Sequence, residues 1–230
     1  MRDTNATTET NRRQYLKTLG AVGAAATVGL AGCAGDAAAT GTLATAVTDQ
    51  PGDIADFASC VVTIQGIWLK PATEGTATEE TDSTADGSDS ETVQTQAAED
   101  VDQSDAREYH EFDEPQEADL VQLQDGNTEL VDDREVETGS YEFLQLDVSG
   151  VEGTLEGGGG AQVDTPGNAP LQFKQAFEVR ENERTRFVAD FTPVKRGRTD
   201  RYLLQPVATG TDVVYEAETT ATPEGTAAES

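Results

Sequence analysis

The chain has 230 residues, and its 44 aspartates and glutamates outnumber its 15 lysines and arginines, which gives a formal net charge of −29. So acidic a chain repels phosphate, and this excludes nonspecific nucleic-acid binding as its default function. At about 1 M salt the Debye length falls to about 3 Å, so dense carboxylates hydrate a protein without straining its fold. The broad acidity therefore favours adaptation to very high salt over one specific acidic function such as Ca²⁺ binding.

An export signal stands near the N-terminus. Arg12 and Arg13 precede a hydrophobic pair and a lysine, in the pattern of twin-arginine export signals, and an uncharged, weakly apolar run follows from Thr18. The run is mostly Gly and Ala, so we favour a signal peptide over the alternative, an uncleaved transmembrane anchor. Twin-arginine export predicts that the protein crosses the membrane already folded.

A lipid-attachment pattern closes this run. Leu30, Ala31 and Gly32 precede Cys33, and small residues before a cysteine are what a lipoprotein signal peptidase accepts. We therefore expect residues 1–32 to be a signal peptide, Cys33 to carry the lipid, and residues 33–40 to form a tether. The predicted location is the outer face of the cell membrane, held there by the lipid on Cys33.

The remaining chain predicts an all-β domain over residues 41–215. Short apolar or alternating segments are separated by turn signals, and no convincing amphipathic helix occurs. This pattern favours an immunoglobulin-like or prealbumin-like β-sandwich. The expected strands cover residues 41–48, 60–70, 107–112, 118–123, 127–131, 141–148, 151–156, 171–179, 184–191, 201–207 and 211–215.

Alternation within these strands predicts the core. Leu171, Phe173, Phe177 and Val179 alternate with polar residues and should share one buried face, as should the apolar positions of 184–191. Trp68 is expected to be the central core aromatic. Cys60 is the sole thiol left once Cys33 is lipidated, so no intramolecular disulfide is possible, and its apolar neighbours predict a buried side chain.

Two segments lack a core pattern. Residues 72–105 contain 11 acidic residues and neither a basic nor an aromatic residue. Such a composition cannot bury enough apolar area to offset the entropy of ordering, so we predict a long disordered acidic insertion between two strands. The Thr-, Ala- and Glu-rich residues 216–230 are predicted to form a disordered tail.

Few residues are suited to catalysis. His110 is the only histidine and is expected at a strand edge, and no G-x-S-x-G motif occurs. The composition predicts neither a catalytic residue nor a cofactor or metal site. Asp49 and Asp53 flank a Pro-Gly turn and have the chemistry to hold Ca²⁺, but aspartates that form the turn are the favoured interpretation.

One basic cluster interrupts the acidic background. Lys195, Arg196, Arg198 and Arg201 lie in a predicted loop between two strands. Arginine forks bind carboxylate, sulfate or phosphate groups, so Lys195, Arg196 and Arg198 are candidate anion-binding residues. The alternative, which the sequence favours, is a basic loop paired with the protein's own surplus of acids.

Several of these segments together resemble a known family. They are the Gly41-Thr42-Leu43 opening, the Asp-x-Pro turn, Trp68-Leu69-Lys70, Gly139-Ser140-Tyr141, Ala189-Asp190-Phe191 and Tyr202 to Val207. Over residues 41–208 the chain is similar to the domain-of-unknown-function family numbered 4382. The resemblance implies a lipid-anchored surface β-sandwich, often from halophilic archaea, and it supplies no functional residue.

Three functions fit these observations. The first is a non-enzymatic binding module with a surface glycan or a surface-layer protein as partner. The second is an extracellular hydrolase that uses carboxylates, which the single histidine disfavours. The third is a structural envelope protein with O-glycosylated spacers, since the mature chain has no N-x-[ST] site.

Overall fold

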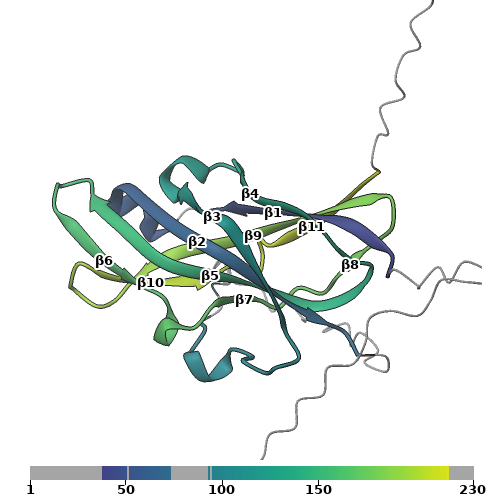
Figure 1. Cartoon of the computed structure of the whole chain (residues 1–230). Helices are drawn as coiled ribbons and strands as arrows, with labels where there is room; N and C mark the ends of the chain where they lie inside the picture. Colours follow the sequence, from purple (N-terminus) through teal and green to yellow (C-terminus); the bar gives the residue numbers. More distant parts are fainter. Residues whose placement is uncertain (1–37, 51, 74–92, 94, 218–230) are drawn as a thin grey trace, which may run out of the picture. The chain divides into compact units, whose positions relative to one another are not determined.

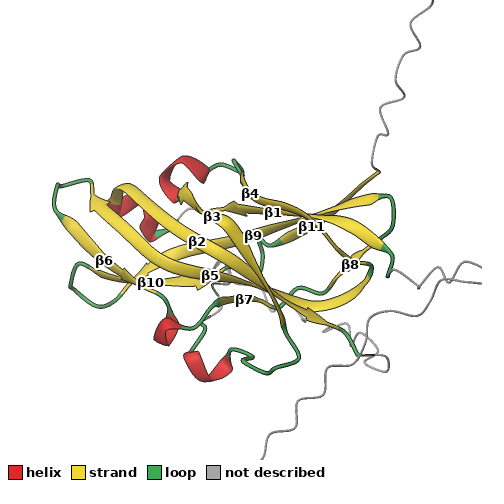
Figure 2. Cartoon of the chain, viewed as in Figure 1, coloured by secondary structure: helices red, strands yellow, loops and turns green. Residues whose placement is uncertain are grey.

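The computed structural model describes residues 38–50, 52–73, 93 and 95–217. In these residues strands and short 3-10 helices occur, without an α-helix (Figures 1 and 2). The predicted all-β fold class is thereby confirmed. The strands are β1 (Thr40–Thr48), β2 (Phe57–Pro71), β3 (Glu108–Asp119), β4 (Glu129–Glu137), β5 (Gly139–Leu155), β6 (Gly160–Asp164), β7 (Leu171–Phe173), β8 (Phe177–Val179), β9 (Glu183–Lys195), β10 (Arg201–Pro206) and β11 (Asp212–Ala217). The 3-10 helices are η1 (Asp53–Asp56), η2 (Ala98–Asp100), η3 (Leu120–Leu123) and η4 (Pro166–Asn168).

The strands are joined into one sheet whose main path runs β3-β2-β5-β6-β10-β9-β1-β4. The longest pairing is antiparallel, between β2 and β5, which lie side by side in Figure 1. β1 pairs in parallel with β9 and antiparallel with β4. β3 and β4 end the path, and Arg134 of β4 donates a hydrogen bond to the Glu111 carbonyl of β3. This contact brings the two ends together, so the sheet is nearly closed.

Alternating side chains of the long strands fill one hydrophobic core. Phe187, Ala189 and Phe191 of β9 are fully buried, as the period-two pattern predicted. Phe173 of β7 packs against both phenylalanines, with ring centroids 6.3 Å and 6.2 Å away. Each buried phenylalanine contributes about 1.5–3 kcal/mol relative to an exposed one. Cys60 is also buried in this core, as predicted.

Trp68 does not lie in the core, so that prediction is wrong. Relative to β5, a register shift next to Gly66 places an extra residue in β2. Beyond the shift Ile67 and Leu69 face the core, and Trp68 lies on the opposite face, partly buried. Its ring packs there against Tyr109, with 4.5 Å between the ring centroids. A β-bulge reverses which residues of a strand face inward, and simple alternation does not reveal its position.

The predicted disordered insertion is shorter than residues 72–105. Residues 74–92 and 94 lie outside the described residues, whereas 95–105 are described and packed against the sheet. Val101 is only 5% exposed, and the backbone N–H of the buried Gln96 donates to Gln205 Oε1 at 2.5 Å. The prediction of disorder is therefore wrong for residues 95–105. Buried glutamines hold this segment, and their polar character concealed its packing in the sequence.

Other differences concern where elements begin and end. Leu120–Leu123 form η3 instead of a strand, and the Asp119 side chain caps it by accepting the Val121 N–H. β5 is continuous where two strands were expected, and the segment 171–179 divides into β7 and β8. β6 was not predicted at all. Of the predicted tail, 218–230 lie outside the described residues. Within the described part of the chain, no helix has the length and apolar character needed to cross a membrane.

The first prediction concerns the ordered and the undescribed parts of the insertion. Replacing residues 75–91 with a Gly-Ser linker of equal length should leave the free energy of unfolding within about 1 kcal/mol, because loop length is kept and no described contact is removed. Extending the replacement to residue 104 removes the buried Val101 and leaves buried glutamines unpaired, at about 1–3 kcal/mol each. Urea denaturation measures both. Equal stability of the two variants would contradict the packing of residues 95–104.

Candidate functional site

A groove of the described residues lies between β3 and β4, where the two ends of the sheet meet. Its volume is about 570 Å³. In β3, the four residues 112–115 lie opposite the single residue Gln65 of β2, between the partners of Gly66 and Ile64, so the strand is bulged there. Phe112, Asp113 and Glu114 of this bulge line the groove. The lining residues that matter here are Phe112 at the base, the exposed Leu130, Arg134, and the acids Glu111, Asp113, Glu114, Asp132 and Asp133.

Arg134 connects the β3 side of this groove with the β4 side. Its guanidinium pairs with Asp132 on its own strand and lies 5.2 Å from the Phe112 ring centroid. It also donates to the Glu111 carbonyl at 3.3 Å. Of the five carboxylates that line the groove, Asp132 pairs with Arg134 and Asp133 pairs with Arg184, which leaves three without an ion pair within the described residues. The groove therefore favours neutral or cationic groups over anions.

His110 lies beside this groove on the edge strand β3, as predicted. Its Nε2 is 4.0 Å from Glu108 Oε2. Burial lowers the pKa of His110, and the positive charge of Arg134 lowers it further. The imidazole is therefore neutral at pH 7. A neutral histidine next to Arg134 adds no positive charge to the groove.

The basic cluster divides into paired and unpaired residues. Lys195 Nζ lies 2.7 Å from Asp56 Oδ2, and Arg201 lies 3.6 Å from Asp164. Arg196 and Arg198 are exposed, and their side chains have no ion pair or hydrogen bond within the described residues. The interpretation of charge balance therefore fits Lys195 and Arg201 and fails for the other two.

Hydrogen bonds hold the backbone of this hairpin. The Arg196 N–H donates to the Arg201 carbonyl at 2.8 Å, and the Thr199 hydroxyl donates to the Arg196 carbonyl at 2.9 Å. Gly197 has a φ of +69°, a value that a side chain disfavours. At its base, the Lys195 N–H donates to Asp53 Oδ2 at 2.7 Å. Arg196 and Arg198 thus extend from a loop whose backbone is held by hydrogen bonds.

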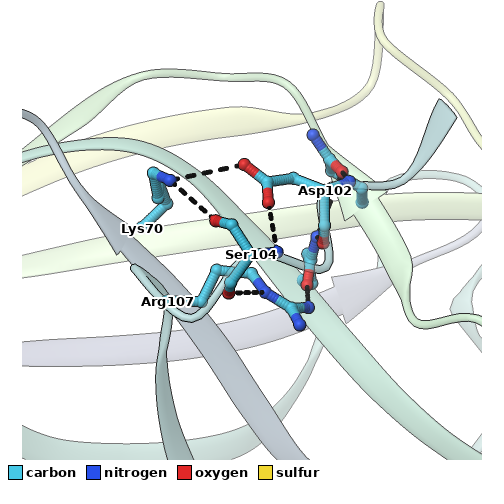
Figure 3. A network of polar contacts seen from close by, with 6 residues as sticks. Lys70, Asp102, Ser104 and Arg107 are labelled. Atoms are coloured by element: carbon cyan, nitrogen blue, oxygen red, sulfur yellow. Dashed lines mark hydrogen bonds and ion pairs between the residues drawn. The ribbon is translucent and has the colours of Figure 1, made fainter.

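A polar network on another part of the sheet was not predicted from the sequence (Figure 3). Lys70 Nζ lies 3.4 Å from Asp102 Oδ2 and donates to Ser104 Oγ at 3.0 Å. The Ser104 N–H donates to Asp102 Oδ1 at 2.7 Å, and this bond is the main reason that the pKa of Asp102 is lowered. Arg107 donates to the Ser104 carbonyl and to Gln145 Oε1, at 3.1 Å and 2.7 Å.

The buried end of this network explains its role. Gln145 is fully buried, and its Nε2 donates to the Asp102 carbonyl at 2.9 Å and to Gln172 Oε1 at 3.0 Å. The Asp102 N–H donates to the same Gln172 oxygen at 2.8 Å. These bonds satisfy buried polar groups and fasten residues 96–107 to β5 and β7. We assign the network to structure and not to ligand binding.

Asp49 differs most from its predicted role. It was expected to form a turn, yet it is only 2% exposed at the end of β1. Burial is the main cause that raises its pKa to about 8, and the negative charge of Asp190 adds to the rise, while the Thr192 hydroxyl lowers it. Asp53, the other predicted turn residue, begins η1.

Three predicted functional residues cannot be placed. Arg12, Arg13 and Cys33 lie outside the described residues, so export and lipidation stay predictions from the sequence. Among the described residues, no group of three or more His, Cys, Asp or Glu side chains is arranged to hold a metal ion.

The family model described as "Domain of unknown function (DUF4382)" matches residues 40–206, which is more than half of the chain. The chain belongs to this family. The match begins at β1 and ends with β10, so the DUF4382 region contains the groove, the arginine hairpin and Asp49. No curated protein and no solved structure matches the chain.

The second prediction concerns Asp49. A folded-state pKa of about 8 means that Asp49 binds a proton in the folded protein that the unfolded chain releases above about pH 4. The stability from this proton is complete below pH 4 and is lost as the pH rises toward 8. Compared with wild type, Asp49→Asn should therefore gain relative stability from pH 5 to pH 8, by up to about 4 kcal/mol at 1.36 kcal/mol per pH unit.

Denaturation in buffers that contain a chelator measures this difference at each pH. Asp113→Asn, which changes an exposed carboxylate of the groove, is the control and should show a constant difference from wild type. Parallel curves for wild type and Asp49→Asn would mean that Asp49 is ionised in the folded protein.

Proposed function

We propose that the protein is an exported, lipid-anchored binding module on the outer face of the cell membrane, without enzymatic activity. Its partner is an anionic surface glycan or a surface-layer protein, contacted through Arg196 and Arg198. The export signal at Arg12 and Arg13 and the lipid site at Cys33 support the location. The acidic composition supports a high-salt environment.

The proposed contact rests on which lysines and arginines lack a partner within the chain. Within the described residues, three of the lysines and arginines have no hydrogen bond or ion pair from the side chain, namely Lys174, Arg196 and Arg198. The others contact acids, amides, hydroxyls or carbonyls of the same chain. In so acidic a chain, internal partners are abundant. Two unpaired arginines on one hairpin are therefore the best candidates for an external anion.

The chemistry of the hairpin fits that role. A guanidinium donates two parallel hydrogen bonds to a carboxylate, sulfate or phosphate group, and this geometry holds the anion more tightly than a single charge does. Loops that connect rigid strands are also where β-sandwich domains place recognition residues. The groove between β3 and β4 offers the opposite charge and does not suit the same partner.

A retention assay tests the proposed contact. Purified protein is passed over immobilised envelope polysaccharide and over immobilised surface-layer protein, in native salt. Arg196→Ser with Arg198→Ser should reduce retention on one of them at least about tenfold, which corresponds to about 1.4 kcal/mol. The melting temperature should not change, because the hairpin's described hydrogen bonds involve backbone and Thr199 atoms.

Two controls accompany this variant. Lys174→Ser removes an exposed, unpaired cation outside the hairpin and should leave retention unchanged. Asp113→Asn with Glu114→Gln changes the groove and should not lower retention either. Retention that falls only in the groove variant would place the binding site in the groove. Unchanged retention in every variant would exclude both the hairpin and the groove as the binding site.

The lipid anchor gives a separate prediction. Cys33→Ser removes the thiol that receives the lipid, so the protein should appear in the medium or remain as an unprocessed precursor. Cell fractionation with an antibody against the β domain measures both products. Arg12→Lys with Arg13→Lys should instead block export. A Cys33→Ser protein of mature size that stays in the membrane fraction would exclude lipidation at this residue.

A further inference from the structure

The groove between β3 and β4 borders two strand edges. β3 and β4 end the sheet path, and within the described residues β3 pairs only with β2 and β4 only with β1. Arg134 donates to the Glu111 carbonyl at 3.3 Å, but no backbone hydrogen bond joins the two strands in the described part of the chain. The free edge of a strand carries unpaired N–H and C=O groups, with which another extended chain can pair.

Of the two edges, that of β4 is the more open to pairing. β3 is bulged over residues 112–115, and Pro115 in this bulge has no N–H to donate. Bulges and prolines protect an edge strand from other chains. β4 contains no proline, and its pairing with β1 shifts by a single residue, at Val131. Leu130 of β4 lines the groove and is 48% exposed, so this edge also offers an apolar side chain.

Charge selects the chain that can use this edge. β4 contains five acidic residues and one arginine, so pairing with the same strand of a second copy would bring like charges together. On the other wall of the groove, β3 presents the exposed carboxylates of Glu111, Asp113 and Glu114, which have no ion pair within the described residues. A basic segment is therefore the complementary occupant. The unpaired edge provides the site, and the carboxylates select what occupies it.

Arg134 shows how the groove holds a cation. Its guanidinium pairs with Asp132, lies 5.2 Å from the Phe112 ring centroid and donates to the Glu111 carbonyl. A carboxylate, an aromatic ring and a backbone carbonyl thus receive one guanidinium. A lysine or arginine from a partner would find free carboxylates for its charge and Leu130 for its methylene stem.

We propose that the groove is a docking site for a short, extended and basic segment of another protein, which adds to the edge of β4. Its backbone pairs with β4, and its lysine or arginine side chains contact Glu111, Asp113 and Glu114 on the β3 wall. The segment is short, because the groove has a volume of about 570 Å³ and lies between the Arg134–Glu111 contact and the connection through η3. This partner differs from the anion proposed for the arginine hairpin, and the two sites are independent.

A titration with a synthetic peptide tests the docking site. The probe is an acetylated and amidated hexapeptide that alternates lysine with valine, and its binding to the mature protein is followed by calorimetry. A buffer of about 1 M potassium chloride screens loose attraction to the acidic surface. We expect saturable binding of one peptide per chain, and no binding of the matched peptide that alternates glutamate with valine. Absence of saturable binding of the lysine peptide overturns the proposal.

Methylated peptides separate strand pairing from attraction between charges. The N–H groups of alternate residues in a strand point to the same edge, so an added strand pairs with β4 through one set only. One peptide carries N-methyl groups on its lysines and the other on its valines, and both keep their positive charges. One of the two should lose binding and the other should keep it. Equal affinity of the two, whether kept or lost, overturns the pairing, and so does displacement of the lysine peptide by spermine, a cation without a peptide backbone.

Variants locate the docked peptide. Glu111→Gln with Asp113→Asn and Glu114→Gln should weaken binding about tenfold, because it removes the free carboxylates of the β3 wall. All three side chains are exposed, so the variant should fold. The matched control changes three exposed acids outside the groove: Glu152→Gln, Glu156→Gln and Glu181→Gln. The control should bind as wild type does, and equal affinity of the two triple variants refutes the groove.

Sedimentation of the free protein examines the other occupant, a second copy of the chain. We expect no dimer that depends on Leu130, because the acidic β4 edges repel each other. A dimer that Leu130→Ser dissociates would assign the groove to self-association and overturn the proposal.

Discussion

The parallel pairing of β1 with β9 is the contact on which the rest of the structure depends. β1 lies between β9 and β4, so it connects β4 to the other strands of the sheet path. It also carries Leu43 and Val47 into the core. The pairing joins residues 42–48 with 184–190, so it closes a long stretch of chain before any hydrogen bond forms. Burial of apolar side chains along both strands offsets that entropy.

β1 positions two of the features described above. Because β1 holds β4 in place, β4 can face the bulged edge of β3, and the acidic groove forms between them. Asp49 follows the Thr48–Asp190 pair at the C-terminal end of β1, where the charge of Asp190 acts on it. Neither feature comes from a local motif. Each arises because a long-range pairing brings together residues that are far apart in the chain.

The distribution of cations follows from the acidity of the chain. Arg134, Arg184 and Lys195 each pair with an aspartate of the same domain: Arg134 with Asp132 on its own strand, Arg184 with Asp133 of β4, and Lys195 with Asp56 of η1. At exposed sites such pairs contribute little to stability individually, so their main effect is to leave few cations uncommitted. Arg196 and Arg198, in the hairpin at Gly197, differ from these cations because their side chains have no partner within the described residues.

Local patterns in the sequence predicted the parts of the fold that depend on them. Alternation identified Phe187, Ala189 and Phe191 as core residues, and it did the same for the apolar residues of β7 and β8. It failed for Trp68, because a bulge next to Gly66 reverses the inward face and leaves no local signal.

Contacts between distant residues explain the other failures. The segment 95–105 was assigned as disordered because its buried partners are glutamines on other strands, which a composition argument does not detect. Asp49 was assigned to a turn because its burial depends on β9. For the hairpin, the sequence located the basic residues but did not show which of them pair internally.

A disulfide test of the β1–β9 register examines the central claim most directly. In a chain whose own cysteines are replaced by alanine, Thr42→Cys with Arg184→Cys joins residues that are directly paired, where Cα atoms lie roughly 5 Å apart. Thr42→Cys with Arg186→Cys joins residues offset by two positions, roughly 8 Å apart and beyond the reach of a disulfide. The parallel register predicts rapid oxidation of the first pair alone, measured by mass spectrometry. Oxidation of the second pair alone, or of neither pair, would contradict it.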